Sequence, residues 1–501
     1  MTTLADYRNE RLRKLEEIKS LGIDPYPSKS LRDTKISEIL ENFEEKDGKS
    51  ATVAGRIVAI RSFGKLAFIK IRDDSGELQI FMQSAPLETP TNFDTKRLKL
   101  LDSGDFIEAS GKVGKSSTGE ISVFANEVRL LGKSLRPLPG RDGFTNKEER
   151  YRRRYVDMNV NPEVRERLIR RSKFWQATRN FMLNHGFVEI NIPVLEHTTG
   201  GADATPFVTH MDATDEDYYL RISHELPLKR LLGGGFEKVF DIGPRFRNEG
   251  IDDEHLPEHI AFESYSAFEN YEDGMNLYEE MIKYVAKETW GTLKFSVSGF
   301  SIDLENGGNP WPRIKYADLL KKEYNIDVFN PDREQLSEIL RTEFKKSEDK
   351  NDSSAKKSLE HTLETASTPH LIDHVWKLIR KRSAGPFWII EEPLALSPLA
   401  KKSSKNPLVT ERFHPVIAGT EMGNGFSELN DPLDQLERFK EQQAARDAGD
   451  LEAQMLDMDF VEMLEYGMPP ACGWGNSERN FWLLEGVSGR EAVPFPIIKQ
   501  R

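Results

Sequence analysis

The sequence predicts an α+β protein in two parts: a small five-stranded β-barrel, then a large domain built on a mostly antiparallel sheet flanked by helices. Short strand-like segments separated by turn residues fill about 51–132, whereas helical and strand patterns alternate after about residue 150. A chain of 501 residues has room for about three domains of roughly 150 residues. We place an N-terminal helix, the barrel and a linker in residues 1–140, and the larger domain in residues 141–501.

The composition narrows the class of protein. Hydrophobic residues make up 38% and charged residues 31%, as in ordinary globular proteins. The net charge of −13 argues against a generally basic nucleic-acid coat, so any nucleic-acid contact must come from a local patch. The single cysteine, Cys472, excludes a disulfide framework and a cysteine-built zinc site. Without a long apolar run or a secretory leader, we expect a cytoplasmic protein that does not associate with membranes.

The N-terminal part is predicted to be a helix followed by a barrel. A charged amphipathic helix occupies part of residues 1–30 and ends in a turn with Pro25 and Pro27. Five strands in under a hundred residues are typical of a closed barrel of the OB type. Turn residues Asp73 to Gly76 join the second strand to the third. The expected strands are Ala51–Ile60, Leu66–Ile71, Glu77–Met82, Phe106–Val113 and Glu120–Leu131.

The larger part mixes both periodicities. Asn161-Pro162 is a helix start, and the apolar stripe that follows ends at Gly186. The alternation from Val188 to Val194 predicts a strand. Residues of about 330–385 are polar, and we interpret them as an insertion with a few helices and one mobile loop around Lys345–Ser358. Further strands are expected at Lys238–Ile242, His259–Phe268, Phe387–Ile390 and His414–Ala418, and further helices at 271–290, 433–447 and 455–466.

Three segments could carry chemistry. Phe246-Arg247-Asn248-Glu249-Gly250 presents an Arg for phosphate or carboxylate and a Glu for an amine, between two strands. Gly419 to Glu428 combines flexible glycines with two carboxylates, which suit Mg²⁺ or an ammonium group. Gly473-Trp474-Gly475 allows close approach of the backbone, and Arg479 then opens a helix. Each segment alone is as readily a surface ion pair, a turn-rich strand pair or an ordinary loop.

Other signatures are weaker. The chain has no Gly-x-x-x-x-Gly-Lys-Ser/Thr loop. Lys401–Lys405 is a basic Ser/Lys run without a partner His-x-Gly-His, so we interpret it as a solvated loop. His255 and His259 have the spacing of zinc ligands on a helix, but Pro257 lies between them and makes a shared helical face doubtful.

Together, and in this order, the segments resemble motifs 1, 2 and 3 of class II aminoacyl-tRNA synthetases. Motif 1 corresponds to the helix 162–185 and the strand ending at Pro193, which implies a homodimer interface. The closer resemblance is to bacterial-type lysyl-tRNA synthetases of subclass b. It covers nearly the whole chain except about 330–385. It also rests on Arg152–Asp157, Asn161–Arg165, Gly200–Ala202, Pro206-Phe207, Tyr219–Ile222, Asn424–Asp431 and Tyr466–Pro470.

The resemblance implies that lysine and ATP form lysyl-adenylate, and that the lysyl group passes to the 3′ end of tRNA(Lys). It implies Mg²⁺ as cofactor. Such chemistry depends on positioning and on charge neutralisation more than on acid–base catalysis. The implied catalytic residues are Arg247, Glu249 and Arg479. The implied ATP ligands are Arg247 on the α-phosphate, Glu249 and His255 on the nucleotide, His259 stacked on adenine, Glu421 and Arg479, with Glu421 and His414 as the metal positions.

The resemblance also implies a lysine pocket and an anticodon face. A buried ammonium must be paired, and two carboxylates with a Tyr hydroxyl would do this. The implied lysine ligands are Gly201 and Glu263 on the α-amino group, Glu225, Tyr265 and Glu428 on the ε-ammonium, and Asn424 and Phe426 along the pocket. The implied anticodon residues are Phe68, which would stack on a base, Gln79 and Glu120, which would read its edge, and Arg56 on backbone phosphate.

The sequence departs from the family pattern at four places. His414 replaces a Glu, Thr420 replaces an Arg, motif 3 is one residue short, and Pro227 interrupts the usual Glu-Leu-Tyr-Leu-Lys. Two alternatives therefore stay open beside an active enzyme. One is a degenerate synthetase that binds tRNA or nucleotide without charging. The other is a paralogue that lysylates a protein such as elongation factor P, although such relatives lack the barrel.

Overall fold

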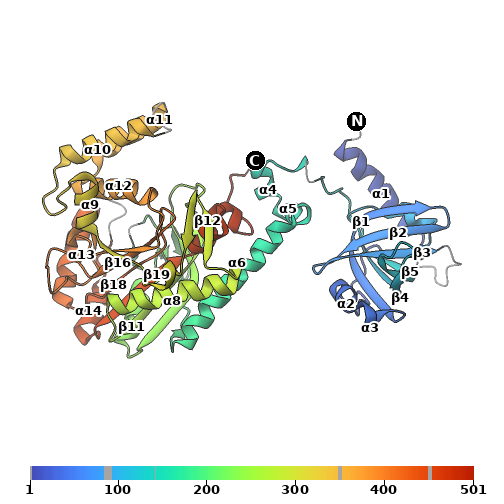
Figure 1. The fold of residues 1–501 in the computed structure, drawn as a ribbon, viewed down its shortest axis with the longest axis horizontal. Coiled ribbons are helices and arrows are strands. Elements are labelled where there is room, and N and C mark those ends of the chain that lie inside the picture. Colours follow the sequence, from blue (N-terminus) through green and yellow to red (C-terminus); the bar gives the residue numbers. More distant parts are fainter. Residues whose placement is uncertain are drawn as a thin grey trace. The chain divides into compact units, whose positions relative to one another are not determined.

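The structure is a computed structural model and describes residues 3–83, 93–140, 143–202, 204–347, 352–448 and 454–500. The chain divides into two compact units (Figure 1). The first unit comprises Met1–Arg150 and Tyr155–Asn161, and the second comprises Tyr151–Arg154 and Pro162–Arg501. In the part of the chain that is described, no helix is long and apolar enough to cross a membrane. The domain boundary after residue 140 stays a prediction.

The first unit contains a closed barrel with the strand order β1-β2-β3-β5-β4. Side chains alternate strictly along β2, where Ala67, Ile69 and Ile71 are fully buried and Phe68 is only partly buried. Short helices α2 (Ile36–Glu41) and α3 (Phe43–Lys46) add Ile36, Ile39 and Phe43 to the same core. The strands are β1 (Ser50–Phe63), β2 (Leu66–Arg72), β3 (Glu77–Gln83), β4 (Phe106–Lys115) and β5 (Ile121–Gly132).

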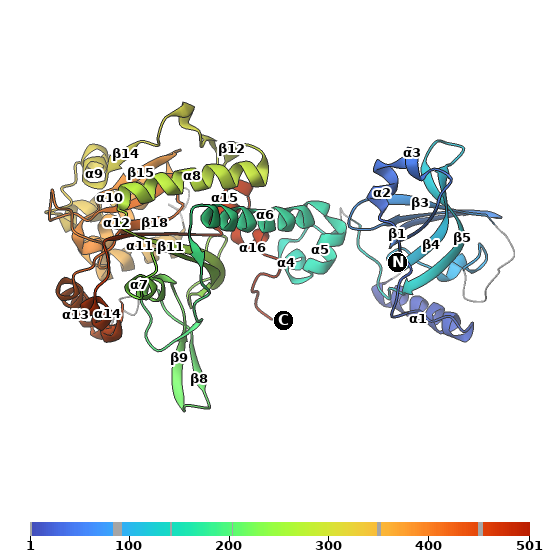
Figure 2. The ribbon, with the colours of Figure 1, turned by 90° about the horizontal axis from the view of Figure 1, so that it is seen from below.

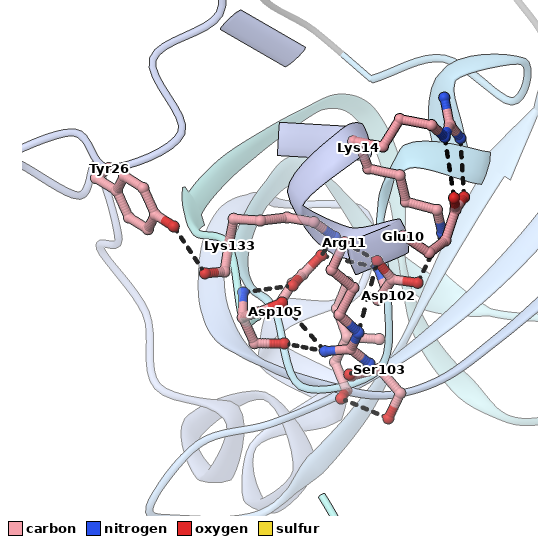
Figure 3. A network of polar contacts seen from close by, with 11 residues as sticks. Glu10, Arg11, Lys14, Tyr26, Asp102, Ser103, Asp105 and Lys133 are labelled. Carbon is pink, nitrogen blue, oxygen red and sulfur yellow. Dashed lines mark hydrogen bonds and ion pairs between the residues drawn. The ribbon is translucent and has the colours of Figure 1, made fainter. Parts of the chain in front are cut away.

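Helix α1 (Leu4–Ser20) is fixed to the barrel by a network of buried charges (Figure 3). Lys133, fully buried at the end of β5, lies 2.5 Å from Asp102 and 2.8 Å from Asp105. Lys14 of α1 reaches Asp102 at 2.7 Å, and Arg11 donates to the Ser103 carbonyl at 2.9 Å. Burial alone would raise the pKa of Asp102, but the hydrogen bonds from Lys133 and Lys14 outweigh it, and its pKa lies below the ordinary value.

The second unit is built on a nine-stranded sheet within the described residues, with the path β14-β15-β16-β18-β19-β11-β10-β6 and β17 beside β16. The two edge pairs, β14–β15 and β10–β6, are parallel, and the pairs between them are antiparallel. The strands are β6 (Val188–Glu189), β10 (Lys238–Phe246), β11 (Glu258–Ala267), β14 (Arg313–Lys315), β15 (Phe387–Ile390), β16 (Arg412–Ile417), β17 (Thr420–Glu421), β18 (Asn424–Ser427) and β19 (Ala471–Ser477).

Helices cover both faces of this sheet. Helices α6 (Pro162–Asn184) and α8 (Tyr271–Trp290) lie side by side on one face, where Phe262 and Trp474 join the main core (Figure 2). Helices α7 (Glu225–Gly233), α13 (Pro432–Asp447) and α14 (Met458–Tyr466) form a second core with Tyr265 and Phe426 of the other face. The polar site therefore lies on the face shared with α7.

Smaller elements complete the unit. Hairpin β8–β9 projects from the sheet near α7 (Figure 2), and β12–β13 forms a separate hairpin. Helices α4 (Lys147–Arg152) and α5 (Arg154–Val160), most of whose residues belong to the first unit, precede α6. The others are β7 (Leu195–Glu196), β8 (Val208–Met211), β9 (Glu216–Leu220), β12 (Lys294–Val297), β13 (Phe300–Asp303), α9 (Tyr316–Tyr324), α15 (Arg479–Glu485) and α16 (Gly489–Ala492).

Two local predictions were wrong. The strand expected over Val188–Val194 is reduced to β6, Val188–Glu189, beyond which Ile190 makes one further backbone hydrogen bond to Phe240 before the chain leaves the sheet at Pro193. The loop expected at Lys345–Ser358 is largely helical. Helix α10 (Arg333–Lys346) extends past the expected start of the loop, and α11 (Ser353–Thr365), capped by Asp352, begins before its expected end. Residues 348–351 of that loop lie outside the described residues. With α12 (Thr368–Lys381), the predicted insertion holds three helices among its described residues.

Candidate active site

The strand alternation of the large sheet gathers the predicted residues on one face. On β11, His259, Glu263 and Tyr265 share a face because they are separated by even numbers of residues. Directly across the ladder lie Gly475 and Gly473 of β19, opposite Glu263 and Tyr265. Beyond them lie Asn424 and Phe426 of β18, and then Arg412 of β16 opposite Phe426. Residues far apart in sequence thus form one polar surface.

This surface lines a cavity of about 420 Å³. The cavity includes residues of motifs 2 and 3 and of the Gly419–Glu428 segment. Glu428 lies just behind the wall and is 1% exposed. The predicted residues in the lining are Gly201, Glu225, Arg247, Glu249, His255, His259, Glu263, Tyr265, His414, Glu421, Asn424, Phe426 and Arg479.

The two glycines of β19 make the cavity possible. A Cβ at Gly473 would lie 2.2 Å from Glu428 Oε1 and 2.2 Å from the Tyr265 ring. A Cβ at Gly475 would lie 2.7 Å from the Glu263 side chain. All three distances are far inside van der Waals contact, so glycine is required for Glu428, Tyr265 and Glu263 to lie over this strand.

One end of the cavity holds a cluster of buried charges. Glu225 and Lys229 are one turn apart on α7, and Lys229 Nζ lies 2.5 Å from Glu225 Oε1. The same ammonium forms an ion pair with Glu428. Burial raises the pKa of Glu225 and of Glu428; Lys229 opposes both shifts, but the net shift of each carboxyl is upward. Burial also lowers the pKa of Lys229, but the two carboxylates outweigh it and the net shift is upward, so Lys229 is charged.

Pro227, a departure in the sequence pattern, does not disturb α7. It is the third residue of the helix, where the backbone N–H would have no intrahelical partner. Glu225 begins the helix and Lys229 follows in its next turn. The helix therefore presents both charges to the cavity despite the proline.

Glu263 and its neighbours form the middle of the cavity. Glu263 Oε1 accepts from Ser223 Oγ at 2.9 Å and from Arg245 Nη1 at 3.2 Å, and Oε2 accepts from the Tyr265 hydroxyl at 3.1 Å. Gly201 has φ +82°, and a Cβ there would lie 2.7 Å from Glu225 Cβ. Its backbone N–H points to Gln454 Oε1 at 3.4 Å. Gly201 thus lets the backbone pass close to Glu225, which a side chain at this position would prevent.

The other end of the cavity is cationic. Arg247 and Arg479 are partly buried, and Arg479 Nη2 contacts the Glu254 carbonyl at 3.3 Å. Arg245 donates from Nε to His259 Nε2 at 3.0 Å, while His259 Nδ1 faces the Leu256 carbonyl at 3.2 Å. Burial and the neighbouring guanidinium groups hold the pKa of His259 well below its usual range, so its ring is neutral. Glu249 and His255 are exposed at the rim, where His255 pairs with Asp252 at 2.8 Å.

The two positions implied for the metal, Glu421 and His414, supply one carboxylate rather than two. Glu421 Oε1 accepts from Trp376 Nε1 at 2.5 Å and lies 3.2 Å from Arg380, both on α12. His414 Nε2 lies 2.9 Å from Glu392, and its Nδ1 lies 3.8 Å from Glu421. The described residues contain no cluster of three or more metal-binding side chains. This donor set does not form a cage of its own, but one carboxylate fits an ion that is coordinated mainly by a nucleotide's phosphates.

The barrel brings its predicted residues together on an outer face. Phe68 contacts Phe81 at a centroid distance of 5.2 Å, and Phe81 contacts Phe124 at 5.1 Å. Gln79 donates to Ser122 Oγ at 3.0 Å, and Ser122 donates to the Glu120 carbonyl at 3.0 Å. Phe68 is therefore not part of the barrel core. Arg56 is set apart: it donates to the Gly104 carbonyl at 2.9 Å and lies 4.2 Å above the Phe106 ring.

Sequence reasoning missed several charged residues of the site. Arg245 lies near the end of β10, two residues before Arg247, and this spacing could have indicated the same face. Lys229 lies four residues after Glu225, a spacing that could have indicated a helical pair. Arg380, Trp376 and Glu392 come from segments without a motif, and no signal in the sequence connects them to Glu421.

Comparisons with known proteins agree with this geometry. Residues 146–499 match the family described as tRNA synthetases class II (D, K and N), and residues 51–131 match the OB-fold nucleic acid binding domain. The chain is 40% identical to a lysine–tRNA ligase of Thermotoga maritima, over 99% of this chain and 97% of the relative. It is 41% identical to one of Fervidobacterium nodosum, over 99% and 94%, and 40% identical to one of Moorella thermoacetica, over 98% and 97%.

Proposed function

This chain belongs to the class II tRNA synthetases of the D, K and N group, and on that premise we propose how its residues carry out the reaction of a lysine–tRNA ligase. The chain activates lysine with ATP and transfers the lysyl group to tRNA. In the first step, a lysine carboxylate oxygen bonds to the α-phosphorus and the bond to the β-phosphate oxygen breaks, releasing diphosphate. In the second step, a hydroxyl of the terminal tRNA adenosine attacks the lysyl carbonyl, and AMP leaves.

The observation that carries the proposal is the cavity with carboxylates at one end and guanidinium groups at the other. Glu225 and Glu428 at the anionic end, with Glu263 toward the middle of the cavity, suit the two ammonium groups of lysine. Arg247 and Arg479 lie toward the other end, where they would neutralise the triphosphate and the charge that develops on it. A substrate that spans the cavity would have its carboxylate between the two ends, facing the α-phosphate.

We assign the roles within this frame. Gly201 and Glu263 hold the α-amino group, and Glu225, Tyr265 and Glu428 hold the ε-ammonium, with Asn424 and Phe426 along the side chain. Arg247 contacts the α-phosphate, Glu249 and His255 contact the nucleotide, and Arg479 contacts the γ-phosphate. His259 stacks on adenine, which its neutral ring favours because a charged ring would repel Arg245 and Arg247.

Family membership implies ATP with a divalent metal, and we propose that the metal is Mg²⁺ carried by the triphosphate. Glu421 would hold it, with His414 beside it. The ion would supply charge neutralisation on the phosphates when bound. Arg380 and Trp376 keep the Glu421 carboxylate oriented toward the cavity by direct contacts.

We also propose tRNA(Lys) as the nucleic-acid partner, a homodimer through α6 and β6, and a cytoplasmic location. The barrel face with Phe68, Gln79 and Glu120 would read the anticodon, and Arg56 would lie near backbone phosphate.

Exposed apolar residues Ile169 and Leu183 of α6 support the proposed dimer interface on this helix. Sedimentation velocity should give about twice the chain mass of 57.3 kDa; a monomer at micromolar concentration would exclude this assembly.

The test of the activity is ATP–pyrophosphate exchange with purified protein, followed by charging of tRNA(Lys). Exchange should require lysine and a divalent metal, and arginine, ornithine or aspartate should support little of it. Absence of exchange at saturating lysine would overturn the proposed function and favour the alternative of a protein that binds without charging.

A further inference from the structure

Lys229 is a buried cation inside the carboxylate cluster. Its side chain is 1% exposed, and its ammonium lies between the carboxylates of Glu225 and Glu428. The same nitrogen lies 5.1 Å from the centroid of the Phe426 ring and 6.0 Å from that of Tyr265. Glu225, Glu428 and Tyr265 are the side chains to which we assigned the ε-ammonium of the substrate, and Phe426 was assigned to its side chain. A protein ammonium is thus built into the pocket that would receive a substrate ammonium.

The position of Lys229 is not explained by helix stability alone. An exposed pair between residues four apart on a helix contributes little to the stability of the helix. Lys229 instead reaches beyond α7 to Glu428, which follows β18 and belongs to a distant segment. Burying three charges is costly unless they compensate one another, so the arrangement points to a requirement of the site.

The charges of the cluster do not sum to zero. Three buried carboxylates, Glu225, Glu263 and Glu428, face two cations that form ion pairs with them, Lys229 and Arg245. The cluster is therefore one positive charge short when the carboxylates are ionised. Lysine with two ammonium groups and one carboxylate carries a net charge of one and restores balance. Without Lys229 the cluster would be two positive charges short, so it would suit a ligand that carries two net positive charges.

We propose that Lys229 is a positioning residue that sets the charge selectivity of the amino-acid pocket through Glu225 and Glu428. Its ammonium holds both carboxylates in place and limits the pocket to one additional net positive charge. The pocket then favours lysine over diamines of the same length that lack the carboxylate. This inference rests on the proposed role of the cavity in binding lysine.

The test compares lysine with cadaverine, a diamine that has the same two amino groups without the carboxylate. The lysine KM and the competitive Ki of cadaverine are measured in ATP–pyrophosphate exchange for the wild type and for Lys229→Met. We expect the ratio of lysine KM to cadaverine Ki to rise at least tenfold in Lys229→Met, while the ATP KM stays within threefold. Lys229→Arg, which keeps the charge, should leave the ratio within threefold of the wild type.

A purely structural role would weaken both ligands together, so an unchanged ratio, or an ATP KM that rises as much as the lysine KM, would overturn the proposal. A second pair of variants covers the case in which Lys229→Met does not fold. Glu225→Gln and the double variant Glu225→Gln/Lys229→Met differ only in the charge of Lys229, and the ratio should again rise about tenfold in the double variant. An equal ratio in the two would also overturn the proposal. If the wild type shows no lysine-dependent exchange, it is the proposed function that fails.

Discussion

At the scale of single residues, the site depends on side chains that are absent as much as on those that are present. Gly473 and Gly475 leave the surface of β19 flat, and Tyr265 and Glu263 lie across it. Glu428 Oε1 occupies the space that a Cβ at residue 473 would need. The two glycines therefore leave room for the carboxylates of Glu428 and Glu263, which explains why glycine stands at both positions of this strand.

Replacing Gly473 with Ala should damage the lysine pocket. The new methyl group would lie 2.2 Å from Glu428 Oε1 and from Tyr265, so one of them must shift. Overpacking of this kind costs about 1–3 kcal/mol. We expect the lysine KM in exchange to rise roughly tenfold, with little effect on the ATP KM. Gly140→Ala is the control, because a Cβ there meets nothing within 4 Å; an unchanged lysine KM in Gly473→Ala would contradict the account.

The sequence predicted the residues of the cavity better than their contacts. Residues in motifs could be named because each motif keeps its residue types at fixed spacing, and the structure brings thirteen of them into the lining of one cavity. Their partners could not be named. Arg380 reaches Glu421 from α12, some forty residues away, and only the packing of the insertion against the sheet decides that contact.

At the scale of elements, regular periodicity was predictive and irregular chain was not. Helix α8 has the bounds expected from its helical pattern, 271–290, and the structure shows that Asn270 caps its start. The alternation from Val188 to Val194 suggested a strand, but Pro193 cannot donate to a ladder and β6 is short. The polar composition around Lys345–Ser358 suggested a loop, yet Asp352 caps a helix there. In the first case the proline outweighed the alternation pattern, and in the second the helix cap outweighed the polar composition.

The attachment of α1 to the barrel depends on the charge network of Figure 3. Lys133→Met would leave Asp105, which is fully buried, without its cation, and breaking a buried pair costs about 3–5 kcal/mol. We expect residues 4–20 to lose protection in hydrogen exchange of the full chain. Lys19→Met is the matched control, since Lys19 is half exposed and pairs with Glu16 at 2.9 Å on the surface of the helix. Equal protection of α1 in the two variants would show that hydrophobic contacts alone hold the helix.

At the scale of the whole molecule, the chain carries two functions in two compact units. The net charge of −13 gives no indication of nucleic-acid binding because the aromatic and polar residues that we propose for it are confined to one barrel face. Part of the acidic excess belongs to the proposed lysine pocket, where Glu225, Glu263 and Glu428 are buried. The overall charge of a chain is therefore a poor guide when recognition is local.

Phe68→Ala should separate the two functions. The variant removes the stacking surface of the barrel face, and loss of base stacking costs about 1–3 kcal/mol per base. We expect the KM for tRNA(Lys) in charging to rise roughly tenfold while lysine-dependent exchange is unchanged. Leu31→Ala, which truncates an exposed apolar side chain of the same unit, is the control. If exchange falls as much as charging, the barrel does not act as the reader of the anticodon.

The central claim is that buried carboxylates select lysine by its ε-ammonium, and Glu428→Gln tests it most directly. Hydrogen bonds to charged groups contribute about 1.5–3 kcal/mol, so the lysine KM in ATP–pyrophosphate exchange should rise roughly 10- to 100-fold. The ATP KM should stay within about threefold, since Glu428 is remote from the guanidinium end of the cavity. Glu465→Gln makes the same change on the exposed side of α14 and should have no effect. An unchanged lysine KM in Glu428→Gln, or an equal rise in both KM values, would contradict the claim.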